Sequence, residues 1–196
     1  MSSVEIRPVT GIAVEPWLDE LARLRIEVFR DFPYLYDGDL DYERRYLDRY
    51  AQSDRSVFVL ALEFNKLVGA ATGLPLKEAD DAFQAPFRQL GADLSTVFYF
   101  GESVLKRDWR GQGIGHRFFD LREQYAEDFG FQHTTFCAVQ RPEDHPARPQ
   151  GYRPLDDFWR GRGYFPQNQL VADFDWTDLG DEQPSHKRMQ FWMHSL

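Results

Sequence analysis

Apolar residues recur along this chain in two patterns, one typical of strands and one typical of helices. Between positions 17 and 29 a stripe of apolar residues at 17, 18, 21, 24 and 28 has the spacing of one helical face. Segments 56–63 and 67–74 are apolar runs separated by Phe64-Asn65-Lys66, which predicts a strand pair joined by a hairpin turn. A first strand at 4–9 and a short second helix at 41–50 complete the first half.

The second half of the chain predicts further strands and helices. Positions 77–90 are weakly helical, and Pro86 is expected to interrupt them. A mostly apolar strand at 97–105 leads through a glycine-rich turn into a helix at 113–129, which Gly130 is placed to end. Segment 140–154 contains four prolines and is predicted to be a loop. The remaining predicted elements are a strand at 133–139, a short helix at 155–162, and strands at 170–176 and 187–194.

These elements predict one α/β domain over residues 1–196, because no linker divides the chain. The 42% hydrophobic and 16% aromatic content supports a folded core. The formal net charge of −9 argues against a nucleic-acid partner. The longest apolar stretch, 57–62, is too short to span a bilayer, and no secretion signal is recognisable. Cys137 is the single cysteine, so no intrachain disulfide can form, and a cytoplasmic location with no membrane partner is expected.

The turn between the predicted strand at 97–105 and the helix at 113–129 has the sequence Arg110-Gly111-Gln112-Gly113-Ile114-Gly115. A glycine turn at the start of a helix points free backbone N–H groups at an anion, and the helix dipole favours negative charge there. The turn therefore predicts a site for a phosphorylated cofactor. A nucleotide P-loop would need Gly-Lys-Ser/Thr, and a dinucleotide fingerprint needs a different glycine spacing. An ordinary glycine-rich turn remains the structural alternative.

The pattern Arg110-x-x-Gly113-x-Gly115 after a strand resembles the pyrophosphate loop of the GNAT acetyltransferase superfamily. A second segment, 155–164, in which an aromatic pair precedes Gly163 and Tyr164, is similar to a late helix of that family. The order of the predicted elements also resembles the GNAT fold. The resemblance implies a central mixed, mostly antiparallel sheet of about seven strands, flanked by helices and splayed between the fourth and fifth strands.

By this resemblance the cofactor is acetyl-CoA, and no metal is expected. The end of the strand at 97–105 is implied to bind the pantetheine arm and the acetyl oxygen, and the glycine turn is implied to hold the pyrophosphate. The residues implied to bind acetyl-CoA are Ser103, Val104, Leu105, Arg110, Gly111, Gln112, Gly113, Ile114, Gly115, His116 and Trp159. Trp159 stands where many members have a tyrosine that protonates the departing thiolate, and an indole N–H does not release its proton.

Acetyl transfer to an amine also needs a base, and Glu102 is the candidate. Strand alternation predicts that Glu102 shares a face with Phe98, Phe100 and Val104, in a strand covered on both sides. Desolvation in such a setting favours a neutral carboxyl, which suits a base that receives a proton from an ammonium group. A buried glutamate paired with an arginine is the structural alternative. The proton donor to sulfur is open among Tyr99, Cys137, Tyr152 and Tyr164, and Tyr164 is the predicted catalytic residue.

In the fold that the resemblance implies, the aromatic and acidic loop at 31–39 borders the acceptor site. Tyr34, Tyr36 and Asp37 are its predicted acceptor contacts, and a turn with aromatic anchors is the alternative. The predicted function is acetyl-CoA-dependent N-acyl transfer to a small-molecule amine by direct attack. A catalytically degenerate acyl-CoA-binding or sensor protein, or a protein lysine or N-terminal acetyltransferase, remains open. The segment 187–196 either completes the sheet or pairs in a homodimer.

Overall fold

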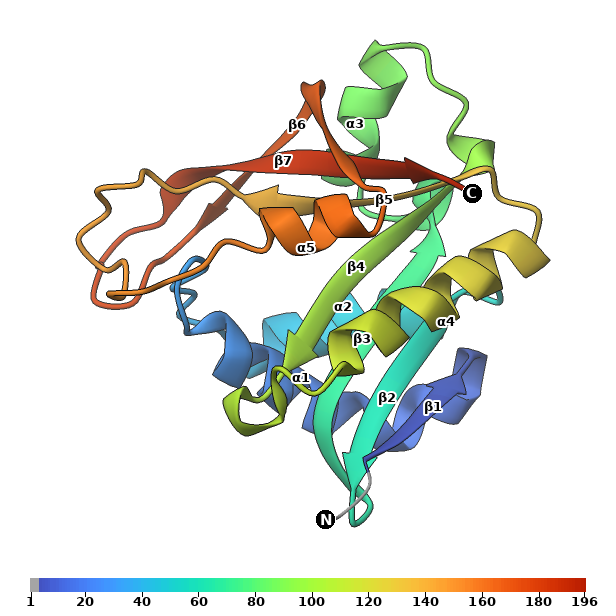
Figure 1. Cartoon of the computed structure of the whole chain (residues 1–196), viewed down its shortest axis with the longest axis horizontal. Coiled ribbons are helices and arrows are strands. Elements are labelled where there is room, and N and C mark those ends of the chain that lie inside the picture. The colour runs from blue at the N-terminus through green and yellow to red at the C-terminus, as the bar shows by residue number, and fades with distance from the viewer. Residues whose placement is uncertain (1–3) are drawn as a thin grey trace.

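The computed structural model describes residues 4–196, and within that range the strands form one mixed sheet (Figure 1). Its strand order is β1-β2-β3-β4-β5-β7-β6. All neighbouring strands are antiparallel except β4 and β5, which confirms the predicted fold class. The strands are β1 (Glu5–Val9), β2 (Val57–Glu63), β3 (Lys66–Pro75), β4 (Val97–Leu105), β5 (His133–Val139), β6 (Phe165–Trp176) and β7 (Ser185–Ser195).

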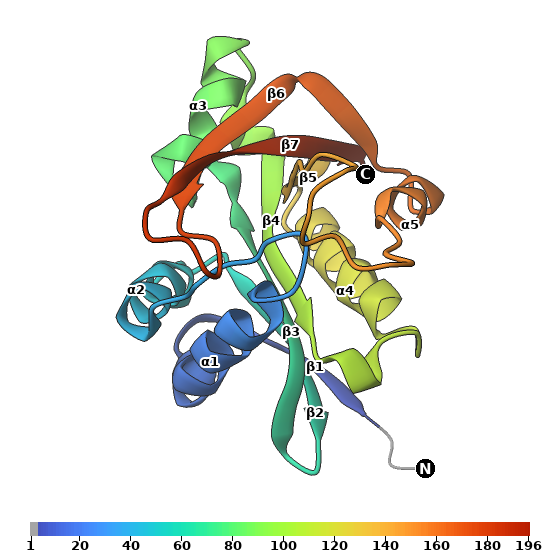
Figure 2. The same cartoon turned by 90° about the vertical axis from the view of Figure 1, so that its left-hand side faces the viewer.

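Helices cover both faces of the sheet, and Figure 2 shows α1 and α2 on one side with α4 and α5 on the other. They are α1 (Leu18–Phe29), α2 (Leu40–Ala51), α3 (Asp81–Gln89), α4 (Ile114–Asp128) and α5 (Asp156–Gly161). Helices α1, α2 and α3 pack on one hydrophobic core through Leu21, Leu47 and Phe87. Helix α4 packs on a second core through Phe118, and α5 joins it through Phe158. The sheet therefore separates two apolar layers.

Some element boundaries differ from the sequence prediction. Strand β6 begins at Phe165 rather than at 170, because an edge strand tolerates Pro166 and the register shifts after that residue. Pro86 lies inside α3 rather than interrupting it, in a helix whose first turn is capped by the Asp80 carboxylate. The segment predicted either to complete the sheet or to pair in a homodimer forms β7, which lies between β5 and β6 and completes the sheet.

Strands β4 and β5 pair only along Val97–Tyr99 and His133–Thr135, and then separate. Figure 1 shows the two strands diverging from that region. Beyond Tyr99 the main chain of β4 pairs with β3 alone. The splay predicted between the fourth and fifth strands is confirmed, and it leaves one edge of β4 open just before the glycine turn.

A β-bulge interrupts β4 within this open stretch. The register of β4 against β3 shifts between Phe100 and Ser103. Gly101 and Glu102 therefore both lie opposite Thr72, so that two residues of one strand face one residue of the other. A bulge of this kind reverses the alternation of side chains along the strand.

The bulge moves Glu102 to the opposite face from the one predicted. Phe98 and Phe100 pack in the α4 layer of the core. Glu102 instead contacts Arg25 of α1, and Val104 packs in the α1–α2 layer. The predicted shared face for these four β4 residues is wrong, because the alternation assumed an uninterrupted strand.

Candidate functional site

The glycine turn between β4 and α4 carries a row of free backbone N–H groups. It follows a 3₁₀ turn, Arg107–Trp109, and precedes Ile114, where α4 begins. Gly111 and Gly113 have φ angles of 75° and 81°, a left-handed conformation that other residues adopt only with strain. Among the described residues, no protein acceptor receives the N–H groups from Gly111 to His116. Such a row at the start of a helix fits an anion of the pyrophosphate type.

Helix α5 lies beside the start of α4 and borders this turn. Gly115 faces the Phe158 ring, since a Cβ built on it would lie 3.7 Å from that ring. The His116 ring packs edge-on against Phe158 with 4.8 Å between centroids, and its Nδ1 lies 3.2 Å from the Arg162 guanidinium. The predicted cofactor residues from Gly111 to His116 therefore lie together in one turn.

Arg110 and Gln112 have exposed side chains that are held by the protein itself. The Arg110 guanidinium donates to the Leu105 carbonyl at 2.9 Å and lies 3.4 Å from the Asp31 carboxylate. The Gln112 amide donates to the Asp108 carbonyl at 3.0 Å. Their part in phosphate binding stays a prediction.

The predicted pantetheine residues 103–105 lie on the stretch of β4 that has no β5 partner. Hydrogen-bonded and non-hydrogen-bonded residue pairs alternate along an antiparallel pair of strands. Lys106 and Val68 form a hydrogen-bonded pair, because the Lys106 N–H donates to the Val68 carbonyl at 2.9 Å. Counting along the register from that bond, Ser103 opposite Ala71 falls at a non-hydrogen-bonded pair. The N–H and C=O of Ser103 are therefore directed away from β3, toward the open edge.

A buried arginine on α4, Arg122, fills the bulge between β3 and β4. Its guanidinium donates to the carbonyls of Thr72 and Glu102, each at 3.1 Å, and to the Ser103 hydroxyl at 2.8 Å. Its Nε donates to the Phe118 carbonyl at 3.0 Å. Burial lowers the pKa of Arg122 to about 10. Sequence reasoning missed this residue, although a cation on the apolar stripe of α4, one turn after Phe118, was the available signal.

Glu102 lies in a buried group of charges on the α1–α2 side of the sheet. Arg25 of α1 is 2.5 Å from the Glu102 carboxylate and also pairs with Glu43 of α2. We call Arg25, Glu43 and Glu102 the Arg25 cluster; none of their side chains is more than 9% exposed. Burial lowers the pKa of Arg25, but the two carboxylates outweigh burial and raise that pKa well above its ordinary value. The cluster thus matches the structural alternative for Glu102, and it holds two carboxylates for one cation.

The Arg25 cluster also has unused acceptor atoms. Within residues 4–196, Glu102 Oε1 and Glu43 Oε1 are buried and have no hydrogen-bond partner, and the same holds for Thr72 Oγ1 opposite the bulge. The Tyr46 hydroxyl lies 3.5 Å from the other Glu102 oxygen and 2.8 Å from the Tyr50 hydroxyl. Excess negative charge with a spare buried acceptor fits a cationic hydrogen-bond donor.

Tyr164 is fully buried, and its hydroxyl is occupied within the protein. That hydroxyl lies 2.7 Å from Thr134 Oγ1 and donates to the Glu123 carboxylate at 2.9 Å. Burial, followed by the Glu123 carboxylate, raises the pKa of Tyr164. These contacts argue against the predicted role of Tyr164 as proton donor to sulfur.

Two further residues considered at the cofactor sulfur lie in apolar surroundings. Trp159 packs against Phe136 of β5 and Trp192 of β7, with 5.0 Å between ring centroids in each pair. The buried Cys137 thiol lies 3.5 Å from the Tyr99 hydroxyl. Burial raises the pKa of Cys137 to about 12. A contact of Trp159 with acetyl-CoA stays a prediction.

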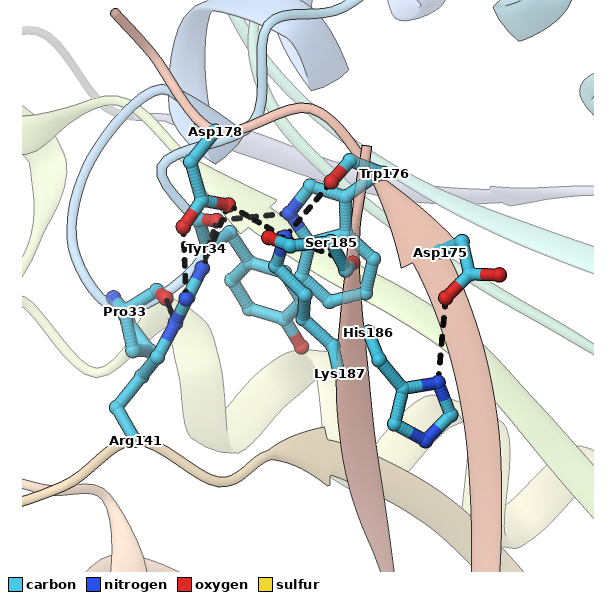
Figure 3. A network of polar contacts seen from close by, with 9 residues as sticks. All are labelled: Pro33, Tyr34, Arg141, Asp175, Trp176, Asp178, Ser185, His186 and Lys187. Atoms are coloured by element: carbon cyan, nitrogen blue, oxygen red, sulfur yellow. Dashed lines mark hydrogen bonds and ion pairs between the residues drawn. The ribbon is translucent and has the colours of Figure 1, made fainter. Parts of the chain in front are cut away.

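Three loops meet at Arg141, which lies just beyond the end of β5 (Figure 3). Its guanidinium donates to the carbonyls of Pro33 and Tyr34, each at 2.8 Å. It also forms a two-pronged pair with the Asp178 carboxylate at 2.7 and 2.9 Å. Lys187 lies 3.1 Å from the same carboxylate. We call Arg141, Asp178 and Lys187 the loop clasp.

The loop clasp joins the α1–α2 loop to the loop between β6 and β7. Leu179 donates to the Leu35 carbonyl at 2.7 Å, and the Trp176 indole donates to the Tyr34 carbonyl at 3.0 Å. Burial raises the pKa of Asp178, but hydrogen bonds from Arg141 and Lys187 outweigh burial and lower that pKa overall. The predicted acceptor loop is therefore fixed by residues far away in the sequence.

The predicted acceptor residues take different positions in this arrangement. The Tyr34 ring stacks on Trp176 with 6.2 Å between centroids, beside the loop clasp. Burial, and then the neighbouring Glu43 carboxylate, raise the pKa of Tyr36. Asp37 is exposed and lies 3.7 Å from Arg30. The structure brings Tyr36 to the Arg25 cluster and leaves Asp37 at the surface.

Residues 19–149 match the model of the acetyltransferase (GNAT) family. The matched segment runs from α1 through the glycine turn to the loop after β5 and covers more than half of the chain. The chain therefore belongs to the GNAT acetyltransferase family. No curated protein sequence matches it.

Solved structures share the fold at low sequence identity. A ribosomal-protein-alanine N-acetyltransferase from Brucella melitensis superposes with a TM-score of 0.61 at 14% identity, covering 98% of this chain and 99% of its own. An N-acetyltransferase from Staphylococcus aureus Mu50 gives 0.61 at 12% identity, covering 99% of each chain. PaiA N-acetyltransferase from Thermoplasma acidophilum, in complex with coenzyme A, gives 0.56 at 12%, covering 99% of each chain. Identities this low show the fold alone.

Across the described range no three or more His, Cys, Asp or Glu side chains are grouped so that they could hold a metal ion. No helix in that range is long and apolar enough to span a bilayer.

Proposed function

We propose that this chain transfers the acetyl group of acetyl-CoA to the amine of a small molecule by direct attack. The observation that carries the proposal is the Arg25 cluster, in which two buried carboxylates share one guanidinium beside the bulge of β4. An anionic site next to the open edge of β4 suits an acceptor that arrives as an ammonium ion. Bound acetyl-CoA supplies the acetyl group in activated form, as a thioester.

The glycine turn and the open edge of β4 support the donor half of the proposal. The N–H groups from Gly111 to His116 are free and would hold the pyrophosphate, with Arg110 adding positive charge. The main chain of residues 103–105 would hold the pantetheine arm and the acetyl oxygen, and Trp159 would lie near the sulfur. Main-chain donors fixed in this way lower the barrier where negative charge develops.

Glu102 is the proposed base. Its buried Oε1 has no hydrogen-bond partner among the described residues, and it lies on β4, whereas the equally unpartnered Oε1 of Glu43 lies on α2. Glu102 is therefore placed to take a proton from the ammonium group, directly or through a water molecule. Arg25 orients this carboxylate, and Glu43 supplies the second negative charge. Because an ordinary thiol titrates at about 8.5, the leaving sulfur can depart as a thiolate without a proton from Tyr164.

The loop clasp supports a small acceptor rather than an extended peptide. It ties the α1–α2 loop, which is proposed to border the acceptor, to the loop after β5 and the β6–β7 loop. A second candidate function is acyl-CoA binding without turnover, because Glu102 is ion-paired and Trp159 replaces the tyrosine found in many members.

Calorimetry with CoA and acetyl-CoA, followed by thiol release on amines and on peptides, tests the proposal. We expect uptake of both coenzyme forms and turnover with small amines. Glu102→Gln should remove most of the turnover. Glu43→Gln removes the same charge from the same cluster and is the matched control, which should retain more activity.

The outcomes separate the candidates. No uptake of either coenzyme form would overturn the proposal. Uptake without turnover on any acceptor would support the non-catalytic candidate. Turnover on peptides alone would replace the small amine with a protein acceptor.

A further inference from the structure

We propose that Arg122 is a positioning residue that holds and polarises the peptide group of β4 that binds the acetyl oxygen. The inference rests on the proposed function, because it concerns the acyl-binding edge of β4. Arg122 is only 1% exposed, so it would act through the main chain rather than by touching acetyl-CoA.

The contacts of Arg122 are centred on the bulge. The ladder between β3 and β4 is interrupted at Thr72 and Glu102, and the Arg122 guanidinium donates to both of their carbonyls at 3.1 Å. A further donor reaches the Ser103 hydroxyl at 2.8 Å. A guanidinium presents its donors in a rigid planar fork, which lets it bridge two strands in a way that an ammonium group does not reproduce.

Arg122 is a costly residue to bury at this position. Its hydrogen bonds go to carbonyl and hydroxyl oxygens rather than to a carboxylate. The rings of Phe100 and Phe119 lie 4.1 and 5.1 Å from its guanidinium carbon. An apolar side chain would fill such a space without the desolvation penalty of a charge. Compared with an apolar residue, Arg122 therefore contributes the hydrogen-bond donors that it directs at the bulge of β4.

The peptide group between Glu102 and Ser103 connects Arg122 to the open edge. Its carbonyl belongs to Glu102 and accepts from Arg122 on one side. Its N–H belongs to Ser103 and, by the register, is directed to the edge that β5 has left. A cation on the carbonyl oxygen of an amide makes the N–H of that amide a stronger donor. Arg122 would thus set both the direction and the strength of this donor.

Calorimetry and infrared spectroscopy with CoA and carbonyl-labelled acetyl-CoA test the proposal on the full chain. In the wild type, the stretching frequency of the bound acetyl carbonyl should be lower than that of free acetyl-CoA. Arg122→Lys should move the frequency back toward the free value and reduce the preference for acetyl-CoA over CoA roughly fivefold, the worth of one hydrogen bond. The affinity of the Arg122→Lys variant for CoA itself should equal that of the wild type.

Arg55→Lys is the matched control. Arg55 also stacks on a ring, 4.7 Å from Phe131, and donates to a backbone carbonyl, that of Phe129; within residues 4–196 it forms no hydrogen bond with β4. We expect neither the frequency nor the coenzyme preference to change in this variant.

Each outcome decides the proposal. If Arg122→Lys keeps the wild-type frequency and preference, the role of Arg122 is refuted while the proposed function stands. If the Arg122→Lys variant does not fold, the measurement on the wild type still tests the proposal. A bound acetyl carbonyl with the same stretching frequency as free acetyl-CoA would refute the claim that Arg122 strengthens the Ser103 N–H as a donor. If the wild type takes up neither coenzyme form, the proposed function fails and the role of Arg122 fails with it.

Discussion

Substitution of Arg141 by methionine tests whether the loop clasp stabilises the fold. The variant keeps most of the apolar stem and removes the guanidinium. It therefore removes both hydrogen bonds to Asp178 and the donors to the Pro33 and Tyr34 carbonyls. The substitution does not change the glycine turn or the bulge of β4, so the variant should take up coenzyme as the wild type does.

The expected loss of stability depends on which hydrogen-bond partners of Arg141 keep a second donor. The Tyr34 carbonyl retains the Trp176 indole at 3.0 Å, and Asp178 retains Lys187 at 3.1 Å. Breaking a buried ion pair costs about 3–5 kcal/mol when one charge is left alone. Among the described residues only the Pro33 carbonyl loses its one donor, while Asp178 and Tyr34 each keep a second donor. We therefore expect a loss of about 2–3 kcal/mol, the worth of the lost charged hydrogen bonds. For a chain of this length the melting temperature should fall by roughly 4–12 °C.

Thermal unfolding followed by circular dichroism and calorimetry measures this change. Arg44→Met is the matched control, because Arg44 makes a similar two-pronged pair with Asp19, at 2.7 and 3.0 Å, on the exposed surface. We expect no measurable change in melting temperature for the control. Equal melting temperatures for the two variants would refute the argument that the loop clasp stabilises the fold.

Further predictions concern single groups. The pKa of Asp178 is lowered in the folded state, so its stabilisation is present above about pH 3.9 and is lost as pH falls below it; the melting-temperature gap to Asp178→Asn should shrink in acid, and a constant gap would contradict this. Gly113→Ala should weaken coenzyme binding at least about tenfold, whereas Gly91→Ala, at a similar φ of 70° with open space, should not. Cys137 has a pKa raised to about 12 and should resist iodoacetamide at pH 8 until the chain is unfolded; rapid labelling of folded protein would refute its burial. Glu102→Gln should lower kcat and change the pH–rate profile, and an unchanged profile would remove Glu102 from the mechanism.

Much of the fold is encoded in short windows of sequence. The apolar stripe of α1, the strand pair at β2 and β3, and the glycine stop after α4 depend on neighbours within a few residues. The glycine turn is also local, because two left-handed residues and a following helix suffice to align free N–H groups. These features were predictable for that reason, and the resemblance to the GNAT family rested on the glycine turn and on the order of the elements.

The sequence by itself determined the order of elements and the turn at Gly111–Gly115, because turn chemistry and side-chain periodicity act between near neighbours. Only the tertiary structure decided which side chains surround Glu102, since a bulge opposite Thr72 reversed the strand's alternation and turned Glu102 toward Arg25. Arg122 reaches a strand carbonyl 50 positions away, and Arg141 reaches a loop carbonyl 108 positions away. Such partners are set by the packing of distant segments, which no local window of sequence contains.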